Sequence, residues 1–355
     1  MGSDLQQVFS DIAKGKRIDK AAALSLLLNA SPVELGFLAQ ERRFFHHPEP
    51  VVTYIIDRNI NYTNVCETLC AFCAFSRAES EEGAYSLSIE DLLQKVKETV
   101  ELGGTGILLQ GGHNPKLPFS YYIEMLSAIK REFPSIHIHA FSPPEIDFFS
   151  NIFGMSVSET LSKLKESGLQ SLPGGGAEIL TEKSRKRIAP KKATTEEWLG
   201  VMAEAHRLGI PSTATMMFGA GEGNDEIIEH LDRIRSLQDR TGGFTAFIPW
   251  TYQPGGRAKL KVEKASYTKY LKVLALSRIY LDNIKNIQAS WLTQGLDIGQ
   301  VALHFGANDL GSVMIEENVV RAAGCSHHTN EAELREVIAS AGFTPVKRRT
   351  LYERV

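Results

Sequence analysis

Three of the four cysteines in this 355-residue chain lie within eight consecutive residues. Cys66, Cys70 and Cys73 have the spacing C-x3-C-x2-C and directly follow a largely apolar run. Three thiolates this close can bind one soft metal centre, and cubane iron-sulfur clusters are normally held by cysteine thiolates. With three protein ligands, one iron of a four-iron cluster stays open to a substrate or cofactor. The pattern therefore favours a catalytic centre over a saturated structural site.

Two other interpretations of these cysteines remain open. The thiols could form a zinc site completed by a distant histidine, or they could be unrelated core residues. Zinc sites usually combine a C-x2-C pair with a second pair of ligands far along the chain, and no such pair follows here. Cys325 stands alone beside His327 and His328, and a solitary cysteine is usually inert. The trio thus favours an iron-sulfur centre.

The cysteine motif resembles that of the radical S-adenosylmethionine (SAM) superfamily, which has this spacing and an aromatic residue, here Phe72, before the last cysteine. Three further segments are similar to the futalosine-pathway branch, and within it to the cyclic dehypoxanthine futalosine synthase family of menaquinone biosynthesis. They are residues 58–66, 137–146 and 172–180. The resemblance covers about residues 57–323. It implies a (β/α)8 barrel of TIM type, a [4Fe-4S] cluster on the three cysteines, and SAM bound at the open iron.

The resemblance also implies which residues hold the cofactors. Gly111 and Gly112 would let the backbone approach the methionyl amine of SAM, although Gly-Gly after a strand is also an ordinary turn. Glu178 would accept the ribose hydroxyls, or else complement a helix dipole. Arg187 could pair with a carboxylate or lie free on the surface, and Met217 could contact adenine or fill the core. The implied set is Cys66, Cys70 and Cys73 for the metal, and Phe72, Gly111, Gly112, Glu178, Arg187, Met217 and Glu222 for SAM.

Polar residues near the expected strand ends are candidates for substrate contact and catalysis. Arg58 and Asn61, just before the cysteines, and Ser142 lie in the layer expected to face a substrate. His113 could act as a base because imidazole titrates near neutrality, and Glu145 is the second catalytic candidate. A lone histidine beside a Gly-Gly turn is more often structural. The same structural interpretation applies to His137 and His139, which alternate with apolar residues in an expected strand.

The resemblance further implies a reaction and its partners. The reaction would be hydrogen abstraction from C4′ of the ribose of dehypoxanthine futalosine, addition of the sugar radical to the attached benzoate ring, and closure of a spiro ring. The partners would be this small-molecule substrate and a low-potential electron donor such as flavodoxin or ferredoxin. Aminofutalosine synthase and the tyrosine-using synthase of deazaflavin biosynthesis are the enzymatic alternatives. A non-enzymatic alternative is an iron-sulfur electron carrier or a zinc scaffold.

Composition limits the remaining functions. The chain has 39 Lys and Arg against 42 Asp and Glu, a formal net charge of −3, so nothing indicates nucleic acid or an anionic membrane as partner. The densest basic run, residues 183–192, is interpreted as a solvated face. The first residues lack the pattern of a secretory signal, and the longest apolar run, residues 21–28, is too short to span a bilayer. We therefore expect a cytoplasmic protein, whose cysteines stay reduced.

Hydrophobic periodicity indicates the elements that must position these residues. Apolar, β-branched runs are typical of parallel strands buried on both faces, and helical patterns with capping boxes alternate with them. The cysteines follow the first strand, where barrel enzymes carry catalytic groups. The alternation predicts a β/α barrel over residues 49–323, after a helical segment at 1–48 and before a C-terminal extension at 324–355 packed on the barrel. The expected strands are 51–56, 105–110, 136–141, a short one before 174, 212–218, 244–250, 287–291 and a weaker one at 310–314.

Overall fold

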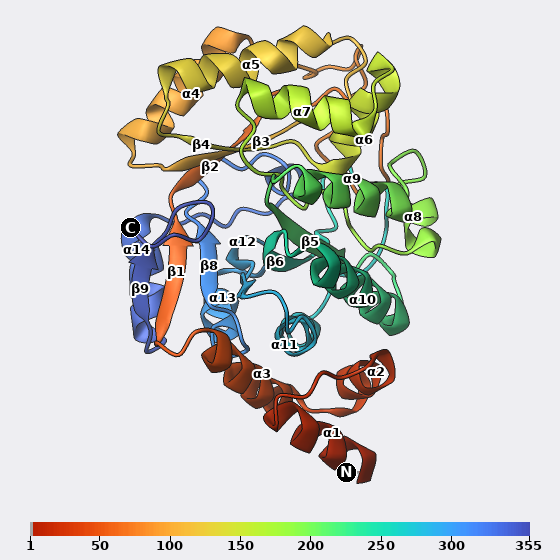
Figure 1. The fold of residues 1–355 in the computed structure, drawn as a ribbon, viewed down its shortest axis with the longest axis vertical. Coiled ribbons are helices and arrows are strands. Elements are labelled where there is room, and N and C mark those ends of the chain that lie inside the picture. The colour runs from red at the N-terminus through yellow and green to blue at the C-terminus, as the bar shows by residue number, and fades with distance from the viewer. Residues whose placement is uncertain (1–2) are drawn as a thin grey trace.

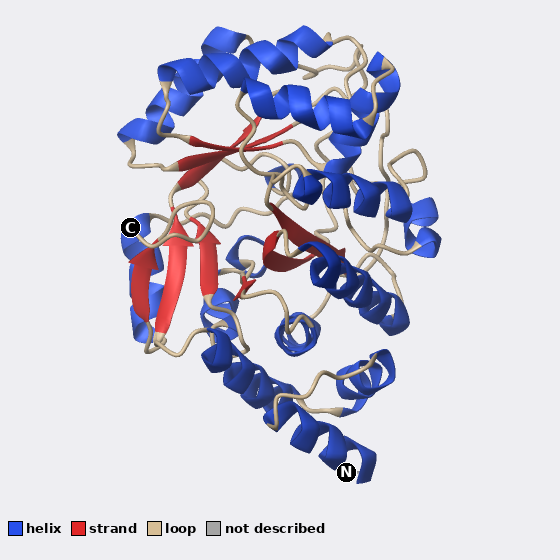
Figure 2. Cartoon of the chain, viewed as in Figure 1, coloured by secondary structure: helices blue, strands red, loops and turns tan. Residues whose placement is uncertain are grey.

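Strands enclosed by helices form the centre of the molecule, a computed structural model that describes residues 3–355 (Figure 1). Strands lie inside and helices outside in the cartoon of Figure 2. The first barrel strand is split at Ile56, so that the cysteines follow its second half. The strands are β1 (Val51–Ile55), β2 (Asp57–Asn61), β3 (Gly106–Gln110), β4 (His137–Ala140), β5 (Ser212–Phe218), β6 (Phe244–Thr251), β7 (Asn286–Ile287), β8 (Asp309–Ser312) and β9 (Thr344–Lys347).

Three groups of parallel strands together trace the barrel wall. β2 pairs with β3 and β3 with β4; β5 pairs with β6 and β6 with β7; β8 pairs with β1. The expected fourth strand consists only of isolated bridges, because Pro173 has no N–H with which to extend it. The predicted barrel is confirmed, with this strand and β7 shorter than expected. The bridges that connect the groups are His139 to Ser171, Leu172 to Ser212, and Gln288 to Asp309.

Helices cover the barrel and begin at caps that the sequence indicates. The Ser88 hydroxyl accepts a hydrogen bond from the Asp91 amide at the start of α4, and Thr194 forms a capping box with Glu197 at α9. α6 begins directly after Ser142, where two prolines occupy first-turn positions that need no amide donor. The sequence interpretation missed this helix and expected only the one that follows it. The covering helices are α4 (Ile89–Glu101), α5 (Phe119–Glu132), α6 (Pro143–Phe153), α7 (Val157–Ser167), α8 (Glu182–Ile188), α9 (Thr195–Arg207), α10 (Asn224–Thr241), α11 (Tyr267–Tyr280), α12 (Trp291–Gln294), α13 (Leu296–Ala302) and the short 3-10 turn η1 (Arg321–Ala323).

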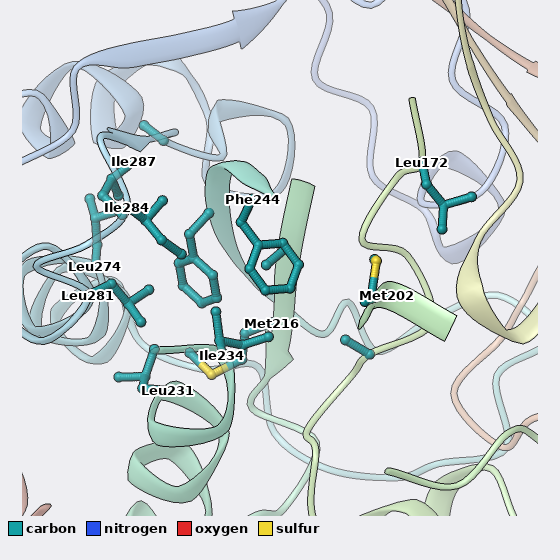
Figure 3. Close-up of a cluster of buried hydrophobic side chains, with 14 of the residues drawn as sticks. Leu172, Met202, Met216, Leu231, Ile234, Phe244, Leu274, Leu281, Ile284 and Ile287 are labelled. Atoms are coloured by element: carbon teal, nitrogen blue, oxygen red, sulfur yellow. The ribbon is translucent and has the colours of Figure 1, made fainter. Parts of the chain in front are cut away.

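The main hydrophobic core fills the layer between the barrel wall and the helices. Side chains of β5 alternate, so that Met216 joins this core while Thr213 and Thr215 face the barrel interior. Figure 3 shows one part of the layer, where Phe244 of β6 and Ile234 of α10 belong to the same buried cluster. The alternation thus separates an apolar outer face from a polar inner face. Within residues 3–355, no helix is both long enough and hydrophobic enough to cross a membrane.

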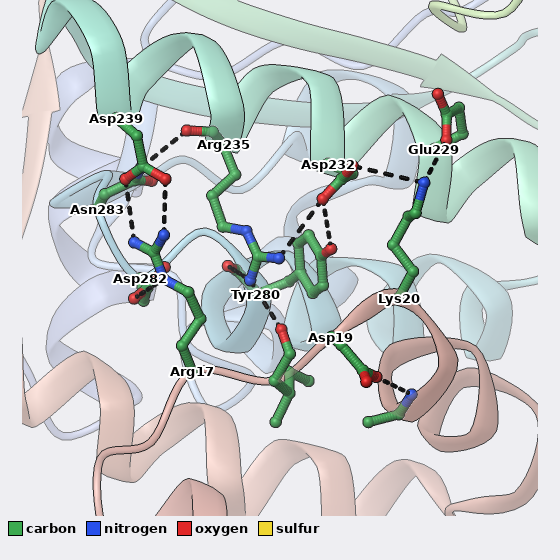
Figure 4. A network of polar contacts seen from close by, with 12 residues as sticks. Arg17, Asp19, Lys20, Glu229, Asp232, Arg235, Asp239, Tyr280, Asp282 and Asn283 are labelled. Atoms are coloured by element: carbon green, nitrogen blue, oxygen red, sulfur yellow. Dashed lines mark hydrogen bonds and ion pairs between the residues drawn. The ribbon is translucent and has the colours of Figure 1, made fainter.

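Helices from the N-terminal segment pack on one side of the barrel. α3 lies against α11, and α2 against α10. Arg17 pairs with Asp239 at 2.6 Å and with Asp282 at 2.9 Å (Figure 4). The buried Arg235 of α10 donates a hydrogen bond to the carbonyl of Ile18 at 2.9 Å. These contacts fix the segment to the helical layer. Its helices are α1 (Ser3–Ala13), α2 (Lys20–Asn29) and α3 (Pro32–His46).

The C-terminal segment contributes to the barrel sheet itself. After α14 (Glu331–Ser340), β9 pairs in parallel with β1. Arg348, which follows β9, is buried and donates to both carboxylate oxygens of Asp309 on β8, with N–O distances of 2.5 and 2.9 Å. The Thr53 hydroxyl of β1 donates to the same carboxylate at 2.5 Å. Both backbone pairing and a buried ion pair therefore join residues 324–355 to the barrel.

We expect Asp309→Ala to lower the free energy of unfolding by about 3–5 kcal/mol, because it leaves the buried Arg348 guanidinium without a countercharge. Arg354→Ala is the matched control, since it breaks the exposed Arg354–Glu49 pair of the same segment and should cost less than about 1 kcal/mol. Urea unfolding followed by circular dichroism measures both. Equal losses in the two variants would contradict a special role for the buried pair.

Candidate active site

The loop after β2, residues 62–76, brings the clustered cysteines into one cavity, and we call it the cysteine loop. Cys66, Cys70 and Cys73 line a space of about 210 Å³ at the carboxyl ends of β2 and β3. All three are free thiols. The Cys66 Sγ lies 2.9 Å from the Thr68 hydroxyl, and the Cys73 Sγ accepts a hydrogen bond from the Ser76 amide at 3.4 Å. Burial raises the pKa of the Cys70 thiol.

Two glycines let the cysteine loop approach the end of β3 closely. A Cβ atom at Gly112 would overlap the carbonyl oxygen of Val65 and lie 2.8 Å from the Cβ of Cys66. A Cβ atom at Gly111 would overlap the ring of Tyr62. Close packing therefore requires glycine at both positions, and it places the backbone of residues 111 and 112 directly beside the thiols.

Glu145 joins the ends of three strands at this cavity. The Tyr62 hydroxyl donates to Glu145 Oε1 at 2.6 Å, and the Gly111 amide donates to the same oxygen at 3.1 Å. The Ser142 hydroxyl donates to Oε2 at 2.6 Å. Burial raises the pKa of Glu145 to about 7, although these hydrogen bonds oppose the shift. Near neutral pH the carboxyl group is therefore able to hold or release a proton inside the cavity.

Lys192 completes the charged wall of the cavity. Its Nζ pairs with Glu178 Oε1 at 2.9 Å, and the side chains are 16% and 5% exposed. The same ammonium group lies 5.5 Å from the centre of the Phe72 ring. The interpretation of residues 183–192 as a solvated face is wrong for Lys192 and for the buried Arg185. Composition could not separate these two residues from their exposed neighbours, because burial depends on how the segment folds over the cavity.

His113 also lines the cavity, stacked on Phe148 with ring centres 4.8 Å apart. Burial lowers the pKa of His113 to about 3, so that its imidazole is neutral at pH 7. Most of the predicted site residues are thus brought together. Those that line this cavity are Cys66, Cys70 and Cys73, the expected cofactor residues Phe72, Gly111, Gly112 and Glu178, the expected substrate residues Asn61 and Ser142, and the expected catalytic residues Glu145 and His113.

Two charged residues predicted for the site are engaged elsewhere. Arg58 alternates with the inward-facing Asn59 and points to the helical side of β2, where it pairs with Glu98 and Glu316 at 2.6 Å each. Glu222 accepts hydrogen bonds from the amides of Gly219 and Ala220 and pairs with Lys269 at 3.1 Å. Neither lines the cysteine cavity, so their geometry gives no support to direct ligand contact.

The other two predicted residues border the cysteine loop from outside. Met217 lies on the inward face of β5 and belongs to a small buried cluster with Cys70 and Tyr252. Arg187 is exposed on α8, with its guanidinium against Gly221. The fourth cysteine, Cys325, donates its thiol proton to the carbonyl of Leu292 at 2.8 Å and is not among the residues that line the cysteine cavity.

A second cavity, which we call the barrel chamber, occupies the barrel interior and adjoins the first. Its volume is about 290 Å³. Four residues line both cavities: Gln110, Gly175, Trp250 and Val319. The cysteines therefore lie on one side of a shared wall and an enclosed space lies on the other.

The sequence interpretation missed the residues of the barrel chamber. Strand alternation could have identified some of them, because Asn59 of β2 and Gln110 of β3 occupy inward positions. It could not have identified Arg348 or Tyr352, which reach the chamber from the end of the chain. The polar lining is Asp57, Asn59, Gln110, His139, Thr213, Thr215, Gln288, Ser290, Thr293, Ser312, Glu317, Arg348, Thr350 and Tyr352.

Comparison with known proteins identifies the family to which the chain belongs. The family model "Radical SAM superfamily" matches residues 60–234, and the model "CofH/MqnC C-terminal region" matches residues 241–355. The chain is 47% identical to the cyclic dehypoxanthine futalosine synthase of Streptomyces coelicolor, over 99% of this chain and 89% of the relative. The chain belongs to the radical SAM superfamily. It is therefore a radical SAM enzyme, and members of this superfamily generally bind a [4Fe-4S] cluster and SAM.

Other relatives of this radical SAM enzyme have different names. The aminodeoxyfutalosine synthase of Thermus thermophilus is 39% identical over 97% of this chain and 94% of its own. The 5-amino-6-(D-ribitylamino)uracil–L-tyrosine 4-hydroxyphenyl transferase of Methanopyrus kandleri is 40% identical over 95% and 94%. Among solved structures, the hydrogenase maturase HydG of Carboxydothermus hydrogenoformans has a TM-score of 0.79 at 20% identity, covering 98% of this chain and 80% of that one. That structure supports the fold alone.

The raised pKa of Glu145 predicts a pH-dependent loss of stability. Between its ordinary pKa near 4.5 and about 7, the unfolded chain releases the proton while the folded chain keeps it. The free energy of unfolding should therefore fall as pH rises through this window, by up to about 3 kcal/mol. Glu145→Gln mimics the protonated acid, so the variant should gain stability relative to the wild type between pH 5 and pH 8.

Urea unfolding at pH 5 and pH 8 measures the free energy of unfolding of the wild type and of Glu145→Gln. Glu159→Gln is the control. Glu159 occupies the same position of the next helix, but hydrogen bonds from Ser156 lower its pKa. The stabilisation by its carboxylate is already complete above about pH 4.5, so Glu159→Gln should be less stable than the wild type by nearly the same amount at pH 5 and at pH 8. A Glu145→Gln variant whose stability follows the wild type at both pH values would contradict the assignment.

Proposed function

We propose that this protein converts dehypoxanthine futalosine into cyclic dehypoxanthine futalosine in menaquinone biosynthesis. The observation that carries the proposal is the pair of adjoining cavities, one lined by three thiols and the other enclosed by the barrel. Sequence identity to the named synthase over nearly the whole chain supports it. The substrate would occupy the barrel chamber, with its reacting atoms towards the wall shared by Gln110, Gly175 and Trp250.

Cys66, Cys70 and Cys73 would hold the cluster. Within residues 3–355, no group of three His, Cys, Asp or Glu side chains is arranged so that it could hold a single metal ion. A cubane instead binds each cysteine through a different iron, so thiols spread around one cavity suit it. The cavity of about 210 Å³ that the three thiols line leaves room for a bulky group beside them. When bound, the cluster and SAM supply abstraction of a hydrogen atom from carbon.

The size of the barrel chamber supports an intramolecular reaction. Its volume of about 290 Å³ is just below the roughly 300–1,000 Å³ found for small-molecule sites. A single bound molecule suits such a space better than two reactants. The chamber would also hold the sugar and the ring close together and exclude water from a reactive substrate.

His139 is placed to accept the proton when the ring radical loses one proton and one electron to restore aromaticity, and a one-electron oxidant takes the electron. It lines the barrel chamber, and its Nδ1 lies 2.6 Å from the Ser171 hydroxyl, which leaves Nε2 free. The same hydroxyl lies 2.7 Å from Nε2 of His137. Burial lowers the pKa of His139 to about 3, so the imidazole is neutral at pH 7 and accepts only a strongly acidic proton there. With Nδ1 of His139 protonated, Ser171 could pass a proton on to His137.

The substrate assignment is tested with reconstituted protein, SAM and reductant under anaerobic conditions. We expect dehypoxanthine futalosine to yield a product lighter by a pair of hydrogens, together with 5′-deoxyadenosine, in mass spectrometry. Cys70→Ala should lose iron and all turnover. Turnover with the substrates of aminodeoxyfutalosine synthase or of the tyrosine-using transferase, and none with dehypoxanthine futalosine, would overturn the assignment while leaving the superfamily intact.

For the proton acceptor, we expect His139→Gln to lower product formation about 10²-fold or more, while 5′-deoxyadenosine formation falls much less. The ratio of deoxyadenosine to product should therefore rise. His206→Gln is the matched control, since His206 also bonds two hydroxyls, those of Ser212 and Thr241, at 2.7 Å each but does not line the chamber. An unchanged ratio in His139→Gln would rule out the proposed role.

A further inference from the structure

Two exposed basic segments flank the cysteine loop, and together we call them the basic rim. Residues 182–192 contain six Lys or Arg and one Glu, of which Arg185 is buried and Lys192 is paired with Glu178, and residues 257–264 contain four Lys or Arg and one Glu. The first segment includes α8, which lies at the periphery of the molecule (Figure 1). This local excess stands out because the whole chain has a net charge of −3. Within the two rim segments, the exposed cations for which the structure shows no ion pair with another described residue are Lys186, Arg187, Lys191, Lys259, Lys261 and Lys264.

Backbone hydrogen bonds attach both halves of the basic rim to the cysteine loop at one residue. Ala71, between Cys70 and Cys73, donates its amide proton to the carbonyl of Ile188 at 2.8 Å. The Ala71 carbonyl accepts from the amides of Lys259 at 2.8 Å and Leu260 at 2.9 Å. The rim is therefore fixed directly to the segment that carries two of the thiols.

A third loop, residues 219–222, lies between the two segments of the basic rim. The Arg187 guanidinium packs against Gly221, and a Cβ atom at Gly219 would lie 2.9 Å from the Cβ of Ala265. The loop thus contacts the first segment and the residue that directly follows the second. Acidic residues lie along the cysteine loop and its continuation, and Glu81 is paired with Arg257. These residues are Glu67, Glu79, Glu81 and Glu82.

We propose that the basic rim is the docking surface for an acidic one-electron carrier protein that reduces the cluster. The inference rests on the proposed cluster site at the cysteines, and not on the identity of the substrate. In this electron transfer the carrier would lose one electron, the cluster would gain one, and no atom would be exchanged. A positive surface attached to the cysteine loop attracts an acidic partner to the point where electron transfer is shortest.

The docking surface is tested by stopped-flow reduction of the reconstituted protein with an acidic flavodoxin in its reduced state. We expect the variant Lys186→Glu, Lys191→Glu, Lys259→Glu to lower the second-order rate at least about tenfold at low salt, because like charges replace opposite ones. The difference should shrink as salt screens the charges. Binding of flavodoxin, measured by fluorescence anisotropy, should weaken in parallel, whereas reduction by excess dithionite should proceed to completion.

The matched control reverses three exposed lysines far from the rim in the chain: Lys14→Glu, Lys97→Glu, Lys163→Glu. It changes the net charge equally, so only a local effect distinguishes the two variants. Equal rates in the rim and control variants would overturn the proposal. So would a rim variant that keeps flavodoxin binding but loses affinity for duplex DNA or anionic lipid vesicles. Because no substrate is present, failure of the cyclisation assay leaves this result unaffected.

Discussion

The close contact between the cysteine loop and the end of β3 is the constraint on which the site depends. Gly112 leaves no room for a side chain between itself, the Val65 carbonyl and the Cys66 Cβ. That contact sets the height of the cysteine loop above the barrel, and Glu145 maintains it by accepting hydrogen bonds from Tyr62 and Gly111. A single buried carboxyl group therefore couples the loop to β3 and to α6. The free energy of this arrangement includes the cost of burying Glu145, which its raised pKa records.

Electrostatics divide the site into two environments. The cysteine cavity contains the Lys192–Glu178 pair and a neutral His113, so a thiolate there meets one nearby ammonium group. In the barrel chamber, the charge of Arg348 is already matched by Asp309. Besides the carboxyl groups of Asp57 and Glu317, the chamber presents hydroxyl, amide, aromatic and aliphatic groups to a ligand. Such a lining orients a polar molecule through hydrogen bonds without binding it through strong charge, which leaves a reactive ligand free to change shape.

Sequence patterns predicted the features that depend on residues close together in the chain. The cysteine spacing predicted the motif, the capping residues Ser88 and Thr194 predicted helix starts, and the apolar run at 212–218 predicted the position of β5. Contacts between distant segments were not predictable in this way. Lys192 looks like its exposed neighbours until the chain folds it over Phe72, and the chamber residues of the C-terminal segment are placed by pairing of β9 with β1. The prediction for Arg58 failed for a third reason. An arginine is a suitable residue for binding a ligand, but the alternation of side chains along the strand directs this one away from the barrel interior, where it pairs with Glu316.

The two family matches contribute unequally to the two cavities. The radical SAM match at residues 60–234 contains the cysteines, Glu145, Glu178 and Lys192, whereas the C-terminal match at 241–355 contributes many of the residues around the barrel chamber. Relatives with three different names share both parts. A common hydrogen-abstracting chemistry requires the first cavity to stay similar among them. If the ligand lies in the barrel chamber, as we propose, differences in reaction would arise from its lining, which includes His139, Trp291 and Tyr352.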